Sequence, residues 1–490
     1  MATVAYASLN LDKPSIRLLY VHKGWPTEDI VCELCESYAD PEQGIPYKAL
    51  SYNWGGLQHE PRERTPAVLV DGHRIRLTQN LYSALRHIRR PDHGIFLWVD
   101  AICINQDDPR EKGHQVKQMG RIYKNAEEVL IWLGTGHEGT DDLLESFSLI
   151  DTKATKSRAI GSTEDWMTLC GRFMNQRWPN ASPTSPRRKQ VLAELLEKPW
   201  FKRVWILQEV ANARTARVLC GNGSCPARTF ALMPSLMRLA VPKHTQAVLD
   251  IMPRIRQNTW WSSNRNLHVL LVKFADSQSS LARDKIYALL GMSDDACNPD
   301  TFYPCYLKSD EQVIRDTATF LLCGEVLDNH VPIPDLQLSD LWLPITQLAG
   351  KVLVWALEQL ETSSTPRSRG GLLVNLTATF IARHLNKGRF KAADLLMILA
   401  EKYGEARRVA DILSNRGAQL FFHVQVAFPW RLCVRIVDPQ LDEEEGPLVC
   451  LGRFALVRCS TKSPPKGCIE RGDDRLELGK CQPLHRNTNV

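Results

Sequence analysis

One tryptophan and one glutamate stand at a spacing that suits the binding of a sugar. The segment 203–214 is predicted to be a helix, on which Trp205 and Glu209 share one face with Gln208 and Asn212. A carboxylate beside an aromatic surface can hold sugar hydroxyls and can stabilise the oxocarbenium-like transition state of N-glycosidic cleavage. We therefore predict Glu209 as a catalytic residue and Trp205 as a substrate-binding residue. The alternative is that Glu209 lies on a solvated face while Trp205 packs on the core.

Three more polar side chains stand at the ends of predicted strands. Asp100 follows the apolar run 96–99, and Ser51 and Tyr52 end the segment 47–52. In open α/β sheets, ligands bind beyond the carboxyl ends of the strands. We therefore predict that Asp100, Ser51 and Tyr52 bind the substrate. The alternatives are that Asp100 caps the following loop and that the other two satisfy turn hydrogen bonds.

The elements that must position these residues alternate between strand and helix. Apolar residues at helical spacing predict helices, and short continuous apolar runs predict strands that are buried on both faces. The predicted elements are a strand at 47–52, a helix at 80–90, a strand at 96–99, a helix at 111–124, a strand at 129–133, a helix at 203–214 and a strand at 216–220. This alternation implies a parallel sheet covered by helices. Trp54, Trp98 and Trp132 are assigned to its core.

The chain has 490 residues, which is too long for one compact core. The predicted regions are an α/β domain at 40–225, a mainly helical region at 226–350, a mixed helix and strand region at 372–458 with its strands at 419–458, and a disordered tail at 460–490. A polar linker is predicted at 361–371. Asp284 is predicted to cap a helix over 285–290, and Arg283, Asp284 and Lys285 are predicted to be solvated charges at the helix start.

Composition and charge favour a protein of the cytoplasm. Hydrophobic residues make up 44% and charged residues 24%, which is normal for a soluble globular protein. The net charge of +6 is too diluted over 61 basic and 55 acidic residues to indicate nucleic acid as a partner. The start of the chain does not resemble a signal peptide, and there is no apolar stretch long enough to span a membrane.

The fourteen cysteines do not indicate a metal site. Cys32 and Cys35 have CxxC spacing, but a structural zinc site needs four ligands, and no second pair of this spacing accompanies them. In a reducing compartment the cysteines are expected to stay reduced and to act mostly as small buried hydrophobes.

Several sequence blocks, in order, resemble the HET (heterokaryon incompatibility) domain family. The blocks are YKALSYNWG at 47–55, LWVDAICINQ at 97–106, the segment 115–134 and RVWILQE at 203–209. A further block, ARDKIYALLG at 282–291, resembles the segment that commonly follows this domain. Asn53 stands where the family usually has an aliphatic residue. No family motif is recognisable beyond about residue 330.

The resemblance implies a role in fungal heterokaryon incompatibility and regulated cell death. HET domains in turn resemble TIR domains, which have a flavodoxin-like parallel sheet. Some TIR domains cleave the nicotinamide–ribose bond of NAD with the glutamate of a WxxxE motif, a motif that Trp205 and Glu209 fit. This implies NAD as the substrate and no separate cofactor, with a second copy or an upstream incompatibility protein as partner. The alternative is a non-enzymatic module that signals by self-association or partner binding.

Overall fold

The structure is a computed structural model that describes two units of the chain. The described residues are 6–25, 27–54, 65–156, 163–177, 186–253, 260–296, 302–323, 326, 334–345, 347–348 and 351–352, and the strands at 420–427, 430–436 and 453–458. The units are Met1–Asp310 and Glu311–Val490. Within the described ranges, no helix is both long and apolar enough to cross a membrane. The predicted linker at 361–371, the helices expected between 372 and 416 and the tail at 460–490 lie outside these ranges.

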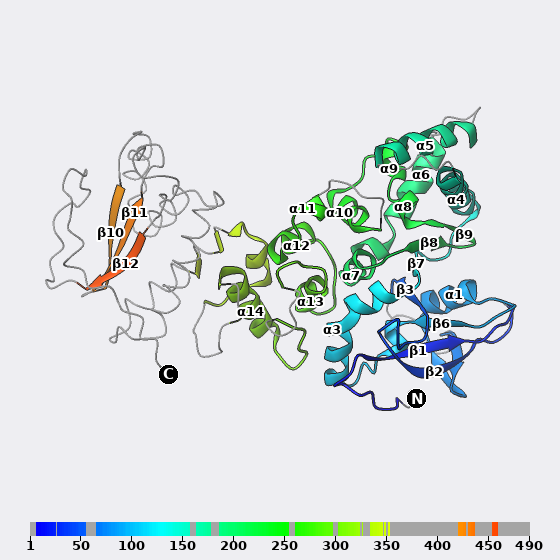
Figure 1. Cartoon of the computed structure of the whole chain (residues 1–490), viewed down its shortest axis with the longest axis horizontal. Coiled ribbons are helices and arrows are strands. Elements are labelled where there is room, and N and C mark those ends of the chain that lie inside the picture. The colour runs from blue at the N-terminus through cyan, green and yellow to red at the C-terminus, as the bar shows by residue number, and fades with distance from the viewer. Residues whose placement is uncertain are drawn as a thin grey trace. The chain divides into compact units, whose positions relative to one another are not determined.

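A mixed sheet of nine strands organises the first unit (Figure 1), in the order β5-β4-β2-β1-β6-β3-β7-β8-β9. The strands are β1 (Ser15–Val21), β2 (Val31–Tyr38), β3 (Lys48–Tyr52), β4 (Ala67–Val70), β5 (His73–Arg76), β6 (Ile95–Trp98), β7 (Val129–Trp132), β8 (Ala216–Cys220) and β9 (Gly223–Pro226). The α/β class is confirmed, and the four predicted strands of this region are present as β3, β6, β7 and β8. These four strands pair in parallel as predicted, whereas the sheet as a whole is mixed, because β1 runs antiparallel to both β2 and β6, and two antiparallel hairpins form the ends.

The parallel centre of the sheet is β6-β3-β7-β8. Numbered along the chain, these strands stand in the order second, first, third, fourth, and the same order begins a flavodoxin-like sheet. That this sheet is flavodoxin-like stays a prediction. In such a sheet the order reverses beside the first strand, and ligands bind there beyond the carboxyl ends. The carboxyl end of β3 is therefore the place to look for a site. That the domain is TIR-like stays a prediction.

Helices cover this sheet and extend the first unit beyond it. They are α1 (Gln79–Ile88), α2 (Asp100–Cys103), α3 (Pro109–Asn125), α4 (Glu138–Lys156), α5 (Thr163–Arg177), α6 (Pro186–Leu196), η3 (Pro199–Lys202), α7 (Ile206–Ala211), α8 (Ala227–Phe230), α9 (Met233–Leu236), α10 (Lys243–Ile251), α11 (Trp260–Ser263), α12 (Leu267–Lys273) and α13 (Asp284–Leu290). The predicted helices at 80–90 and 111–124 are confirmed as α1 and α3. Thr78 caps α1, and Asp108 caps α3 by accepting hydrogen bonds from the backbone N–H groups of Arg110 and Glu111.

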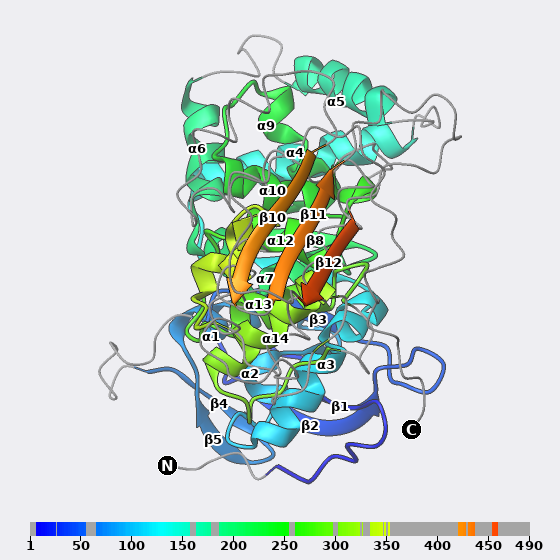
Figure 2. The same ribbon diagram turned by 90° about the vertical axis from the view of Figure 1, so that its left-hand side faces the viewer.

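The helix that carries Glu209 is shorter than the predicted 203–214. The backbone at Arg203 is extended and bridges to Gln278, and the N–H of Val204 donates to the Gln278 carbonyl at 2.9 Å, so α7 begins only at Ile206. Helices α3 and α13 both contact α7, and Figure 2 shows α7 and α13 close together. Their approach is tight, because a Cβ added to Gly291 would lie 2.6 Å from Oε1 of Gln208. Residues 206–210 are accordingly all buried.

The second unit contains α14 (Asp310–Cys323) apart from its first residue, and η4 (Leu338–Trp342). It also contains an antiparallel sheet of β10 (Leu420–Ala427), β11 (Trp430–Ile436) and β12 (Arg453–Arg458). These strands fall in the stretch 419–458 that the sequence marks as strand-rich.

The described cysteines are free thiols, and most are buried. Burial raises the pKa of the Cys32 thiol to about 12, which leaves it protonated and unreactive at neutral pH. The expectation of small buried hydrophobes is thus confirmed for the described cysteines. Among the described residues, no group of three or more His, Cys, Asp and Glu side chains could hold a metal ion.

We expect Gly223→Ala to destabilise the protein. A Cβ at Gly223 would lie 2.8 Å from the Cα of Asp141 in α4, so backbone would have to move, at a cost of about 1–3 kcal/mol. Gly171→Ala in α5 is the matched control, because a Cβ there meets nothing within 4 Å and a helical alanine is neutral or stabilising. Denaturant unfolding of both variants checks this; equal stabilities would contradict the tight approach of β9 to α4.

Candidate functional site

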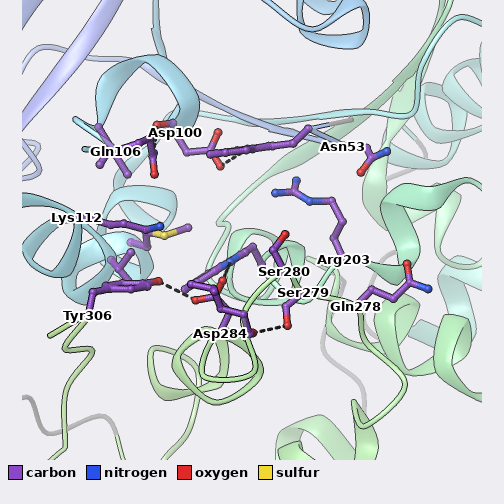
Figure 3. A pocket seen from close by; sticks show the side chains of 16 residues that line it. Asn53, Asp100, Gln106, Lys112, Arg203, Gln278, Ser279, Ser280, Asp284 and Tyr306 are labelled. Atoms are coloured by element: carbon purple, nitrogen blue, oxygen red, sulfur yellow. Dashed lines mark hydrogen bonds between the residues drawn. The ribbon is translucent and has the colours of Figure 1, made fainter. Parts of the chain in front are cut away.

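A pocket of about 560 Å³ opens beyond the carboxyl ends of β3 and β6 (Figure 3). This volume is typical of a small-molecule site. Its lining residues are Asn53, Trp54, Asp100, Ile104, Gln106, Lys112, Val116, Met119, Arg203, Trp205, Gln278, Ser279, Ser280, Leu281, Asp284 and Tyr306. The pocket therefore lies at the edge of the sheet where this fold class binds ligands.

Asp100 forms one wall of the pocket and is 7% exposed. Its Oδ2 accepts a hydrogen bond from Nε1 of Trp54 at 2.8 Å, and its Oδ1 accepts one from the backbone N–H of Ala101 at 2.7 Å. Burial raises the pKa of this carboxyl, while the Arg203 guanidinium and the Trp54 indole oppose the rise. The Asp100 carboxylate thus fixes the Trp54 indole at the pocket. The Trp54 indole and the Arg203 guanidinium stabilise its charged form.

Asp284 forms the opposite wall and is 6% exposed. Its Oδ1 accepts a hydrogen bond from the Tyr306 hydroxyl at 2.9 Å, and its Oδ2 accepts one from Nε1 of Trp205 at 3.4 Å. Burial raises the pKa of Asp284, and Tyr306 opposes the rise most strongly. The prediction that Asp284 caps α13 is wrong, since Arg283 is the N-cap residue and makes no side-chain cap.

The Arg203 side chain extends into the space between Asp100 and Asp284 (Figure 3). Its Nη1 donates to the backbone carbonyl of Tyr52, at the end of β3. The guanidinium also lowers the pKa of both Asp100 and Glu209. A second cation, Lys112, reaches the pocket from α3 with its Nζ 4.6 Å from the centre of the Tyr306 ring. The two walls therefore offer carboxylates, cations and indole rings to one ligand.

The family model described as "Heterokaryon incompatibility protein (HET)" matches residues 47–209. Residues 47–209 are a HET domain. The chain is also similar to "Heterokaryon incompatibility protein 6, OR allele" of Neurospora crassa, with 26% identity over 338 residues. The match covers 60% of this chain and 49% of the relative. The chain thus spans about half the length of that curated relative. No solved structure gives a significant match.

Glu209 of the HET domain lies neither on a solvated face nor on the pocket surface. It is 1% exposed, and neither carboxyl oxygen makes a hydrogen bond of normal geometry, although the nearby Ser51 hydroxyl lowers its pKa somewhat. Burial raises the pKa of Glu209 to about 8, against the Arg203 charge and with support from Asp100. Glu209 is therefore a buried acid that holds its proton at neutral pH.

The structure places only two of the five predicted site residues on the pocket wall, Asp100 and Trp205. Ser51 is fully buried in the HET domain, where its Oγ accepts a hydrogen bond from Nε1 of Trp200 at 2.9 Å. Tyr52 is also buried, and its phenol lies against Asp100. Together with Glu209, these two residues lie behind the wall that Asp100 and Arg203 form. Their roles in binding or catalysis stay predictions.

Sequence reasoning missed much of the pocket. Trp54 was assigned to the core but is 36% exposed, whereas Trp98 and Trp132 are buried as predicted. Asp284 and its neighbour Arg283 were expected to be solvated. Instead, Asp284 lines the pocket, and Arg283 pairs with Asp310 at 2.5 Å and donates to the Lys308 carbonyl. The signal in the sequence that points to this wall is the block 282–291, which resembles the segment that commonly follows the HET domain.

Proposed function

We propose that this chain acts in the cytoplasm in heterokaryon incompatibility and cell death, and that its pocket hydrolyses the nicotinamide–ribose bond of NAD. The matched family and the name of the Neurospora crassa relative support the biological role. The observation that carries the chemical role is the buried Asp100 carboxylate, held by an indole and facing a pocket with a guanidinium at the carboxyl edge of the sheet. A second copy or an upstream incompatibility protein stays the predicted partner.

The proposed reaction breaks the bond between the ribose C1′ and the nicotinamide nitrogen. The bonding electron pair leaves with nicotinamide, and the ribose gains oxocarbenium character. Water then adds to C1′ and loses a proton, which gives ADP-ribose. An ionised Asp100 would stabilise this positive charge, and the indoles of Trp54 and Trp205 offer surfaces to planar rings. Arg203 and Lys112 would meet the phosphates.

Glu209, the predicted catalytic carboxylate, would enter this reaction as a neutral acid. Two neighbouring carboxyl groups disfavour each other's charge, so a proton kept on Glu209 would favour the ionised form of Asp100, against the burial that raises the Asp100 pKa. Glu209 would then be the neutral acid of this pair, and Asp100 would be the anion. In the described conformation, a ligand would meet Asp100 and Arg203 before Glu209.

We expect Asp100→Asn to lower NAD hydrolysis about a hundredfold or more, because one group that stabilises the transition state is lost. The measurement is nicotinamide release by the purified full chain, together with NAD content and survival of fungal cells that express it. Asp294→Asn is the matched control, because Asp294 pairs with Arg265 and does not line the pocket. A folded Asp100→Asn protein that kills cells as well as the wild type without depleting NAD would reject the enzymatic interpretation and favour a non-enzymatic interaction module.

A further inference from the structure

One continuous line of contacts along the pocket wall starts within the HET match and reaches beyond it. The Trp205 indole and the Tyr306 hydroxyl both donate to Asp284, at 3.4 and 2.9 Å. The Tyr306 ring in turn lies under the Lys112 ammonium, 4.6 Å from its centre. All four residues line the pocket. Asp284 and Tyr306 lie beyond the matched residues 47–209, so this wall joins the HET domain to the segment that follows it.

The two oxygens of Asp284 divide their hydrogen bonds between two aromatic side chains. Arg283, its neighbour in the chain, hydrogen-bonds instead to Asp310 and to the Lys308 carbonyl, at 2.5 Å each. Asp284 and Arg283 therefore do not form a hydrogen-bonded ion pair with each other. A hydrogen bond to a buried carboxylate is stronger than one between neutral groups. The 2.9 Å bond therefore orients the Tyr306 ring firmly, and the longer 3.4 Å bond orients the Trp205 indole more weakly.

We propose that Asp284 is a positioning residue of the ligand site, which fixes the Trp205 indole, with Tyr306 beside it, as the wall against which a nucleotide packs. This inference rests on the proposed function only in that the pocket binds a nucleotide. It makes the block 282–291 part of the site, so the residues matched by the HET family supply only part of the pocket. A role for Asp284 in folding alone would leave the affinity of the folded protein unchanged.

The test is the binding of ADP-ribose and of NAD to the purified full chain by calorimetry. Asp284→Asn keeps the size of the side chain, but it has one acceptor oxygen for two donors and loses the charge. We expect affinity to fall about tenfold, as expected when charge-assisted hydrogen bonds to one carboxylate are lost. Tyr306→Phe removes one donor and keeps the ring under Lys112, so a smaller loss is expected. Asp294→Asn, the control, should bind as the wild type does.

A double-mutant cycle separates positioning from general damage. If Asp284 acts through the Trp205 indole, the double variant Trp205→Phe/Asp284→Asn should bind within about twofold of the weaker single variant. If the two residues act independently, their losses should multiply. Thermal unfolding of every variant establishes that folded protein is being compared.

The outcomes distinguish this inference from the proposed reaction. Multiplying losses, or unchanged affinity in folded Asp284→Asn and Tyr306→Phe proteins, would overturn the positioning role and leave NAD hydrolysis standing. Binding of ADP-ribose with the expected coupling, but without any cleavage of NAD, would reject the reaction and keep the positioning role. A wild-type chain that binds neither compound would overturn both.

Discussion

Replacing Glu111 by Gln is expected to destabilise the protein by about 3–5 kcal/mol, because it leaves a buried arginine without its counter-charge. Arg17 of β1 and Glu111 of α3 are each about 5% exposed as side chains, and two hydrogen bonds of 2.6 and 2.9 Å join them. Glu111 Oε1 also accepts a hydrogen bond from the backbone N–H of Asn105 at 2.7 Å. The pair thus fastens the strand β1 to the start of α3.

Urea unfolding of Glu111→Gln and of the double variant Arg17→Met/Glu111→Met checks this expectation. The double variant removes both charges and should recover part of the loss, although it leaves the Asn105 N–H and the Cys103 carbonyl without these partners. Asp294→Asn breaks the exposed Arg265 pair and should cost at most about 1 kcal/mol. If Glu111→Gln costs no more than Asp294→Asn, the buried Arg17–Glu111 pair does not stabilise the position of β1.

The Glu209→Gln variant is expected to differ from the wild type in the pH dependence of its stability. The folded protein holds the Glu209 proton up to a pKa of about 8, whereas the unfolded chain releases it near the usual glutamate value. The folded state then binds more protons, so the free energy of unfolding falls as pH rises from the unfolded to the folded pKa. The penalty at pH 7 is on the order of 3 kcal/mol. The amide of the Glu209→Gln variant does not titrate, so this variant should escape the penalty.

Unfolding free energies at pH 5 and at pH 8 test this. At pH 5 the wild type and the Glu209→Gln variant should have similar free energies of unfolding. At pH 8 the variant should be the more stable protein. Parallel curves over this range would contradict a buried, protonated Glu209. This differs from the sequence-based picture of an exposed carboxylate, for which the substitution would leave stability nearly unchanged at every pH.

The local sequence predicts a helix or strand where the apolar residues of that element themselves mark its buried face. Helix α1 has its apolar residues on one face, and β7 is a short apolar run buried throughout. Strand β1 was missed because polar residues occupy buried positions in it: Ser15 and Arg17 are both buried. What makes Arg17 acceptable there is Glu111, 94 residues away. A partner so distant leaves no mark in the local sequence.

The sequence predicts a residue of the candidate site where that residue comes directly after a predicted strand. Asp100 stands two residues beyond the end of β6, and the rule for open sheets predicts it at the ligand edge, where it lies. Helical periodicity also predicts Trp205 and Glu209 on one face, but it could not show that α7 begins only at Ile206 and that α3 and α13 pack against it. Asp284 and Tyr306 reach the pocket through contacts with Trp205 and Lys112 that are distant in sequence, so no local pattern could place them there.

The two end strands of the nine-stranded sheet affect how readily the protein aggregates at high concentration. Strands β5 and β9 have only four residues each; β5 exposes His73, Arg74 and Arg76, and β9 ends in Pro226, which has no N–H to offer. Short, charged or proline-ended border strands are poor templates for an added strand. Edge-to-edge growth into fibrils is therefore disfavoured at both borders of this sheet.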